Sequence, residues 1–539
     1  MSRMFELSDR AVDQIAADDP SLAVVLAIPG IEPGLTDFSP GGIDARAELT
    51  RGLLAEVETT PAENDADRRA AGVMRHHLQH AAAADEAGDP LRDINILSSP
   101  PQQIRMALEF APANATGELV DQVPSALAGW RTALGEGAAR GLPASRRQAL
   151  RVAEQLAVYG DSWISSFAEE RGCSDSTSAA AAAAFRDTAV WLTDVYAQQA
   201  DPADAVGEER YLRAAAAFNG IELDLDDTFA WGWHEVDRLS RAMRTEVDEL
   251  YPGLPMTEVR ARLDADPAYQ IQGIPALVDH LTSLTRTATE RVDGELFDID
   301  PRVRECGVEI AAAGSAAAPY YVQPSEDLSR PGTTWYPANG DTVFPRWWLE
   351  TVWFHEGVPG HHLQLGAIAV HDDVSRFQRV LGTTSGHAEG WALYAENLAD
   401  ELGWFADPGT RIGYLSAQLM RAVRVVVDIG LHTDRRVPAG FRGERRSITP
   451  DLALTMLTDL ALLPEPFARS EVDRYLGMPG QAISYKVGER VWTQLRDDAR
   501  AAAGASFDLK SWHAQAFDLG PMGLAQFTEE MRAVSPDPH

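Results

Sequence analysis

The feature that most constrains this chain is a helical period that recurs through long segments. Residues 44–58, 145–170 and 174–200 are rich in Ala, Leu, Glu and Arg. Their apolar residues recur about every 3.6 positions, as on one face of an α-helix. The alanine run at residues 179–184 lies inside the third segment, so we interpret it as close helix packing rather than as a linker. These segments predict a mostly α fold built from many helices.

Strand-like sequence is concentrated near residues 305–340. The segments AAPYYVQPS (317–325) and TTWYPA (333–338) flank a turn sequence, SRPG, and predict a small β element. With 539 residues, the chain exceeds what one compact core usually serves. We therefore expect two lobes and a cleft between them: an N-terminal helical lobe over residues 1–300 and a helical lobe over residues 301–539 that carries the motifs described below. No linker marks this boundary, so we leave a single continuous fold open.

The charge balance disfavours several classes of partner. The chain has 47 basic and 81 acidic residues, a net charge of −34, which argues against nucleic acid and anionic membranes. The two cysteines, Cys173 and Cys306, are too few for a disulfide framework or a Cys-rich zinc site. We find neither a basic start followed by an apolar run nor an apolar stretch of about eighteen residues, so we expect no signal peptide and no membrane span. A cytoplasmic protein fits these features.

The stretch FHEGVPGHHLQ (354–364) opens like the His-Glu-x-x-His signature of zinc peptidases, but Pro359 stands where the second histidine belongs. In a regular helix, His355 and His361 would lie about 9 Å apart along the axis on different faces, and His362 about 10.5 Å away. Two imidazoles so placed cannot share one ion at about 2.0–2.1 Å. A regular helix therefore cannot form a metal site here.

The proline changes this expectation. It removes a backbone donor and clashes with the preceding turn, and the flanking Gly357 and Gly360 tolerate unusual dihedral angles. A two-residue bulge would restore a relation close to i, i+4 between His355 and His361. The sequence thus predicts a distorted turn that brings His355 and a second histidine to one metal ion. His361 and His362 remain alternatives for that second ligand.

A metal of this class takes a third protein ligand from another segment and keeps one position for water. The helical segment GHAEGWALYAENLADELGW (386–404) offers Glu389, with His387 and Glu396 as alternatives. We expect Glu389 to be the third ligand.

Polar residues follow one face of the otherwise apolar segment 413–432. Five of them recur at three- and four-residue steps: Tyr414, Gln418, Arg421, Asp428 and His432. We interpret the segment as a buried helix whose polar face lines a cleft. Arg421 or the neighbouring Arg424 would suit a substrate carboxylate, because a guanidinium binds carboxylates in a bidentate manner. His432 on this face and Gln481 further on complete the candidate substrate-binding residues.

The segment YLGMPGQAISYKVG (475–488) supplies candidate oxyanion stabilisers. Its Tyr475 and Tyr485 carry hydroxyl groups that can donate to a developing oxyanion. Each of them, taken alone, is more typical of a packed aromatic residue whose hydroxyl group is already satisfied.

The blocks HEGVPGHHLQ, GHAEGWALYAE, RAVRVVVDIGLH and MPGQAISYKVG, in this order and spacing, resemble the bacterial domain-of-unknown-function 885 family. That family is similar to the helical zinc metallopeptidases of the carboxypeptidase Taq type. The resemblance implies that His355, His361 and Glu389 are zinc ligands and that Glu356 is the general base. Tyr475 and Tyr485 would match a His and a Tyr that contact the reacting carbonyl oxygen in related peptidases, with Tyr in place of His at the first position.

These observations together predict a zinc-dependent peptidase that acts on short peptides or small amides. Two alternatives use the same residues differently: a metal-dependent hydrolase of another amide or ester, and a non-catalytic binding protein that keeps the fold without metal. We expect no nucleic-acid or membrane partner and leave a homodimer open.

Overall fold

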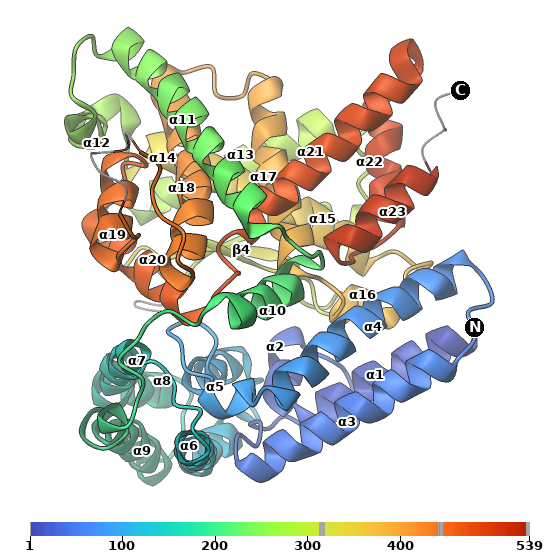
Figure 1. Ribbon diagram of the computed structural model, residues 1–539, viewed down its shortest axis with the longest axis vertical. Helices are drawn as coiled ribbons and strands as arrows, with labels where there is room; N and C mark the ends of the chain where they lie inside the picture. The colour runs from blue at the N-terminus through green and yellow to red at the C-terminus, as the bar shows by residue number, and fades with distance from the viewer. Residues whose placement is uncertain (1, 312–317, 440, 442–445, 535–539) are drawn as a thin grey trace. The chain divides into compact units, whose positions relative to one another are not determined.

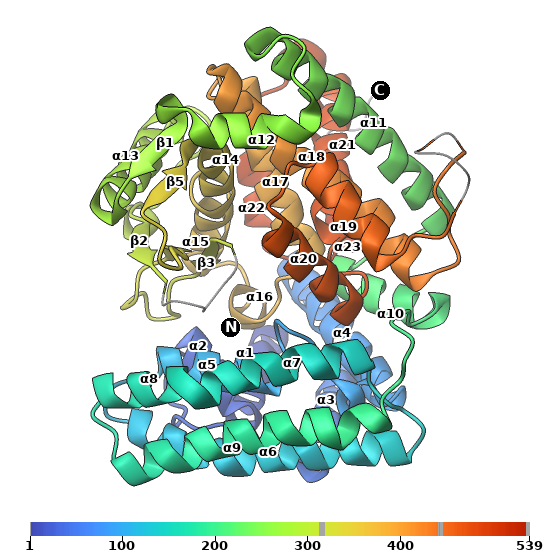
Figure 2. The same ribbon diagram turned by 90° about the vertical axis from the view of Figure 1, so that its left-hand side faces the viewer.

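The computed structural model describes residues 2–311, 318–439, 441 and 446–534, and it confirms a mostly α fold with a small β element (Figure 1; Figure 2). The chain forms two compact units, each assembled from three segments. The first comprises Met1–Val206, Ser375–Leu381 and Asp473–Met478; the second comprises Gly207–Val374, Gly382–Val472 and Pro479–His539. The boundary predicted near residue 300 lies inside the second unit.

Helices build the first unit. They are α1 (Arg3–Asp18), α2 (Pro20–Leu26), α3 (Pro40–Thr59), α4 (Asp65–Glu86), α5 (Pro100–Phe110), α6 (Thr116–Ala139), α7 (Arg146–Val158), α8 (Ile164–Glu170), α9 (Asp175–Asp194) and the later α16 (Arg376–Val380). Serine caps fix several of their starts: Ser39, Ser145 and Ser174 each accept a hydrogen bond from the backbone N–H three residues on.

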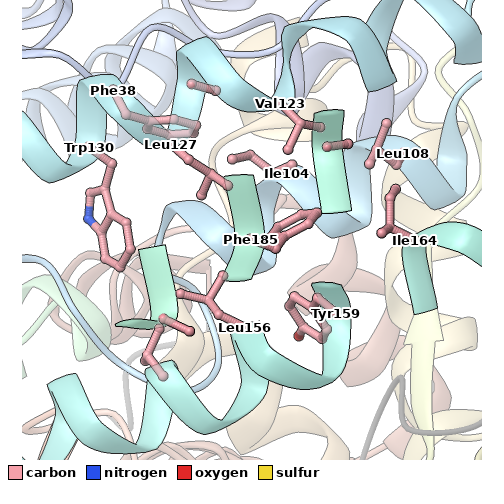
Figure 3. Packing of buried hydrophobic residues seen from close by; sticks show 14 of the residues in the cluster. Phe38, Ile104, Leu108, Val123, Leu127, Trp130, Leu156, Tyr159, Ile164 and Phe185 are labelled. Atoms are coloured by element: carbon pink, nitrogen blue, oxygen red, sulfur yellow. The ribbon is translucent and has the colours of Figure 1, made fainter. Parts of the chain in front are cut away.

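An apolar core fills the interior of the first unit (Figure 3). Trp130 of α6 and Phe185 of α9 are almost fully buried there, among residues such as Leu156 of α7. In the alanine run, Ala181 and Ala182 are buried, and a Cβ added to Gly160 would lie 2.8 Å from the Ala182 carbonyl oxygen. The small residues therefore let the chain segments approach closely, as the sequence predicts.

Helices also dominate the second unit. They are α10 (Glu208–Asn219), α11 (Leu225–Leu250), α12 (Met256–Ala265), α13 (Ile274–Val292), α14 (Arg346–Glu356), α15 (His361–Ala369), α17 (Ser385–Glu401), α18 (Pro408–His432), α19 (Pro450–Asp459), α21 (Ser484–Ala503), α22 (Leu509–Asp518) and α23 (Leu524–Val534). One further helix, α20 (Glu465–Gly477), begins in this unit and ends in the first.

Helix α18 packs along α11 and α14, and α17 packs along α21 (Figure 1). Residues 412–432 of α18 are all buried, polar ones included, so the prediction of a buried helix is confirmed. Across the residues that the structure describes, we find no helix with the length and apolar character needed to traverse a bilayer.

Short strands form the β element. In one sheet, β4 (Thr333–Tyr336) lies between β2 (Gly307–Ile310), to which it is parallel, and β3 (Tyr320–Val322), to which it is antiparallel. The predicted strand segments contain β3 and β4; residue 317 of the first segment lies outside the described residues. A second sheet pairs β1 (Gln270–Gln272) with β5 (Val343–Pro345), which leads directly into α14 (Figure 2).

Candidate metal centre

The chain turns sharply between His355 and His361 of the HEGVPGHH stretch. Helix α14 ends at Glu356, and α15 begins at His361, so residues 357–360 form a turn between two helices rather than a bulge within one. The Gly360 N–H donates to the Phe354 carbonyl oxygen at 3.0 Å. A Cβ on Gly360 would lie 1.9 Å from the His355 carbonyl oxygen, so only glycine fits.

A tryptophan from another helix fixes this turn. The indole Nε1–H of Trp391, on α17, lies 3.0 Å from the Pro359 carbonyl oxygen and 3.1 Å from that of Gly360. Trp391 is fully buried, so the turn is tied to the core of the second unit.

The turn brings His361 beside His355. Their ring centroids lie 4.8 Å apart, at an interplanar angle of 83°. Glu389 of α17 completes the group: its Oε2 lies 3.2 Å from His355 Nε2 and 3.4 Å from His361 Nε2. One ligand atom from each of these residues falls within 4.8 Å of the other two. Among the described residues, no other group of three or more His, Cys, Asp or Glu side chains converges in this way.

His362, the alternative second ligand, is occupied elsewhere. Its Nε2 lies 3.0 Å from the Val303 carbonyl oxygen, which can only accept, so Nε2 carries the proton. Its Nδ1 then accepts from the Tyr321 hydroxyl at 3.0 Å. Burial lowers the pKa of His362 to about 4, which keeps the ring neutral. The structure thus places His361, and not His362, in the cluster.

Glu356 follows His355 directly at the end of α14. Burial raises the pKa of its carboxyl group to about 8; the neighbouring His361 opposes this shift, and the Glu389 carboxylate reinforces it. A carboxyl group whose pKa lies near neutrality can both accept and return a proton, as a general base must.

Glu396 fixes the orientation of the His355 ring through Nδ1. This fully buried residue of α17 has its Oε1 2.9 Å from His355 Nδ1, and because a carboxylate only accepts, Nδ1 carries the proton. The Thr351 hydroxyl donates to Oε2 at 2.9 Å. Burial opposes ionisation, but the Arg421 charge and the His355 hydrogen bond outweigh it and lower the pKa of Glu396. Nε2, which faces Glu389 Oε2, is then the nitrogen through which His355 would bind a metal, as in the carboxylate–histidine–zinc arrangement.

Tyr485, at the start of α21, stacks on His355. Its ring centroid lies 5.9 Å from that of His355, at 18° between the ring planes. The Arg424 guanidinium carbon lies 4.5 Å from the Tyr485 ring centroid, and that of Arg421 lies 5.8 Å away. All three residues were predicted from the sequence, and the structure brings them to the cluster.

The two arginines differ in what already binds them. Arg424 donates through Nε and Nη2 to one oxygen of Glu471, at 3.1 and 2.6 Å. Arg421 contacts Glu396 at 3.5 Å through Nη2, while its Nε, although buried, has no hydrogen-bond partner among the described residues. Glu471 thus holds the Arg424 guanidinium, whereas the buried Nε of Arg421 meets no acceptor among the described residues.

The other predicted residues lie in different surroundings. Gln481 has its Nε2 3.4 Å from the Ser385 hydroxyl at the start of α17. His432 is buried 4.0 Å from Asp428, with its ring against that of Tyr211. Tyr475 is fully buried in the first unit, where Arg474 covers its ring at 5.0 Å.

His387, an alternative third ligand, packs against Trp492 and Phe527, with Gln364 Nε2 3.2 Å from its Nδ1. It is not a member of the cluster.

The sequence did not predict that two further residues, Glu396 and Trp391, hold the cluster in position. Glu396 was considered only as a ligand, although its spacing of seven residues from Glu389, two helical turns, places both on one face of α17. Trp391 gives no signal in the sequence beyond being an apolar residue in a helix.

The donor set suits zinc. Two imidazoles and one carboxylate form a typical three-ligand set of catalytic zinc sites, and the buried Glu396 supplies the outer partner that such histidines usually have. These features define a mostly α protein with a candidate two-histidine, one-carboxylate metal centre.

The chain belongs to the family described as bacterial protein of unknown function (DUF885), whose model matches residues 20–531. A comparison with curated proteins gives no match.

Two solved structures share the fold. One is described as the "putative lipoprotein from Colwellia psychrerythraea"; it is 19% identical, with a TM-score of 0.79 over 98% of each chain. The other is described as a "putative lipoprotein of unknown function from Shewanella oneidensis"; it is 17% identical, with a TM-score of 0.71 over 99% of this chain and 100% of the other. At such identities the likeness establishes the fold alone.

Proposed function

We propose that this protein is a zinc-dependent peptidase that hydrolyses short peptides through an activated water molecule. The observation that carries the proposal is the convergence of His355, His361 and Glu389, with Glu356 next to the first ligand. The resemblance to helical zinc peptidases of the carboxypeptidase Taq type, which the sequence motifs suggest, favours the same function and stays a prediction. A zinc ion held there would polarise the scissile carbonyl group and lower the pKa of a bound water.

The chain's own residues supply the remaining steps. Glu356 accepts the proton of the attacking water and returns it to the leaving amine, a role that its raised pKa suits. Tyr485, held between His355 and Arg424, provides a hydroxyl for the developing oxyanion. Arg421, whose buried Nε has no hydrogen-bond partner among the described residues, would bind a substrate carboxylate. Tyr475, Gln481 and His432 stay predictions for catalysis and substrate binding.

The test is hydrolysis of a peptide library, with a panel of non-peptide amides and esters alongside, before and after chelation. Glu356→Gln should retain zinc and lose about 10²- to 10⁴-fold in kcat, the usual contribution of a general base. Glu350→Gln is the matched control, since Glu350 lies on the same helix but pairs with Arg346 at 2.9 Å. A zinc-loaded protein that cleaves only the non-peptide panel would replace the peptidase by another hydrolase. One that cleaves neither would refute the proposal.

The cytoplasmic location expected from the sequence also stays a prediction. Cell fractionation tests it, and recovery of the protein with the membrane fraction would contradict it.

A further inference from the structure

A chain of buried polar side chains leads away from the candidate metal centre to Lys486 of α21. It runs from His355 to Glu396, then to Gln418 of α18, whose Nε2 lies 3.4 Å from Glu396 Oε2. Gln418 Oε1 lies 3.1 Å from Lys486 Nζ. Glu396, Gln418 and Lys486 are each at most 1% exposed, so water does not substitute for these contacts.

Lys486 is a buried cation with its acceptors in place. Besides Gln418, its Nζ contacts Glu489 of α21 through a short ion pair and Glu235 of α11 at 3.4 Å. An ammonium group has three protons to donate, and three acceptor side chains surround this one. Asn397 of α17 donates to the other oxygen of Glu489, which fixes that carboxylate as well.

Lys486 and Glu396, on either side of Gln418, determine the orientation of the Gln418 side-chain amide. An ammonium group only donates, so the Gln418 carbonyl oxygen must face Lys486. The Gln418 amide nitrogen then faces Glu396, which only accepts. Reversing the amide would place nitrogen against Lys486 and oxygen against the Glu396 carboxylate, and both contacts would be repulsive.

Close packing of helices keeps these polar side chains within hydrogen-bonding distance of one another. Helices α17 and α21 touch at a pair of glycines, where a Cβ added to Gly390 would lie 2.5 Å from the Gly488 Cα. Gly390 is the residue after Glu389, so the contact that brings Lys486 near also sets the position of the third candidate ligand.

We propose that Lys486 and Gln418 are positioning residues of the metal centre. Lys486 fixes the direction of the Gln418 amide, the amide keeps Glu396 turned toward His355, and Glu396 holds the His355 ring with Nε2 directed at the metal. This inference rests on the proposed zinc site, and it assigns a role at that site to two residues that do not touch the metal ligands.

The experiment measures the zinc affinity of the full chain by competition with a chromophoric chelator, together with the visible spectrum of the cobalt-substituted protein. Removing a direct outer partner of a ligand typically weakens metal binding about 10- to 100-fold. Lys486 and Gln418 do not contact a candidate ligand themselves, so the effect of replacing them should be smaller. We expect Lys486→Met and Gln418→Leu each to weaken zinc binding roughly 3- to 10-fold. Both variants should also alter the cobalt spectrum, which reports ligand geometry.

A double-variant cycle separates positioning from general destabilisation. If Lys486 acts through Gln418, the double variant should bind zinc no more weakly than Gln418→Leu alone. Glu489→Gln is the matched control: it perturbs the same buried cluster but leaves the contact between Lys486 and Gln418, so zinc affinity and the cobalt spectrum should stay as in the wild type. If Lys486→Met does not fold, a comparison of zinc affinity between Gln418→Leu and Glu489→Gln still tests whether Gln418 positions Glu396.

The outcomes are distinct. Wild-type affinity and spectrum in Gln418→Leu and Lys486→Met would overturn this inference and leave the zinc site intact. Equal losses in Glu489→Gln, or fully additive losses in the double variant, would also overturn it, because they indicate destabilisation alone. A wild-type protein that binds no zinc would instead refute the proposed function.

Discussion

Replacing Glu396 by glutamine tests how strongly the outer partner of His355 supports the metal centre. In the wild type, donors surround the carboxylate: His355 Nδ1–H and Thr351 Oγ1–H at 2.9 Å each, and Gln418 Nε2–H at 3.4 Å. A glutamine keeps the volume but has one acceptor oxygen. If that oxygen faces His355, its amide nitrogen faces the Gln418 amide nitrogen, and Lys486 prevents Gln418 from turning over.

The magnitude follows from this mismatch. One buried polar group left without a partner costs about 1–3 kcal/mol. Losing the carboxylate partner of a metal-bound histidine typically weakens metal binding about 10- to 100-fold, or about 1.4–2.7 kcal/mol. We therefore expect Glu396→Gln to bind zinc about 10- to 100-fold more weakly, with the folded structure retained.

A chelator competition assay measures this affinity, and circular dichroism verifies the fold. Glu401→Gln is the matched control: it makes the same change on the same helix, where Glu401 is half exposed and binds Arg496 at 3.0 Å. Its zinc affinity should stay within about twofold of the wild type, because exposed ion pairs contribute little. Equal zinc affinity in Glu396→Gln and Glu401→Gln would show that Glu396 does not orient His355 for metal binding.

Three further predictions concern stability. Saturating zinc, at about 100 times its Kd, should raise the free energy of unfolding by about 2.7 kcal/mol; chelator should reverse the gain, and His361→Ala should show none. Gly390→Ala should lower the free energy of unfolding in urea by about 1–3 kcal/mol, because the added Cβ meets Gly488 at 2.5 Å; an unchanged value would contradict the close approach of α17 and α21. Burial lowers the pKa of the His513 imidazole to about 3, whereas its pKa in the unfolded chain is about 6.5. The stability that depends on this ring being neutral is therefore complete above about pH 6.5 and is lost as the pH falls toward 3. By pH 5 the loss is about 2 kcal/mol; His513→Phe should remove this part of the acid destabilisation in zinc-free protein, and an equally steep decline in the variant would show that His513 is not its source.

The sequence predicts the helices and the ligand motif because both depend on local order. The period of residues 174–200 and the Pro-Gly turn at 359–360 act over a few positions, so a single segment carries the signal. The form of the distortion was harder to predict: a two-residue bulge within one helix was expected, whereas α14 and α15 are separate helices joined by a turn. The difference follows from backbone contacts at Gly360 that only the folded chain reveals.

The groups that support the site depend on contacts between helices. Lys486 looks like an ordinary solvated lysine in the sequence, and its burial follows from the approach of α21 to α17 and α18. Arg424 was expected to bind substrate, and no pattern near it indicates that Glu471, 47 residues away, holds its guanidinium. Such long-range pairs leave no periodic signature in one sequence.

The most direct test of the account is an anomalous-difference map from crystals grown with zinc. We expect a single strong peak within about 2.0–2.2 Å of His355 Nε2, His361 Nε2 and a Glu389 oxygen. The same peak should vanish in His361→Ala and persist in Glu356→Gln. A map without zinc density between these three side chains, or with zinc bound through His362 instead, would contradict it.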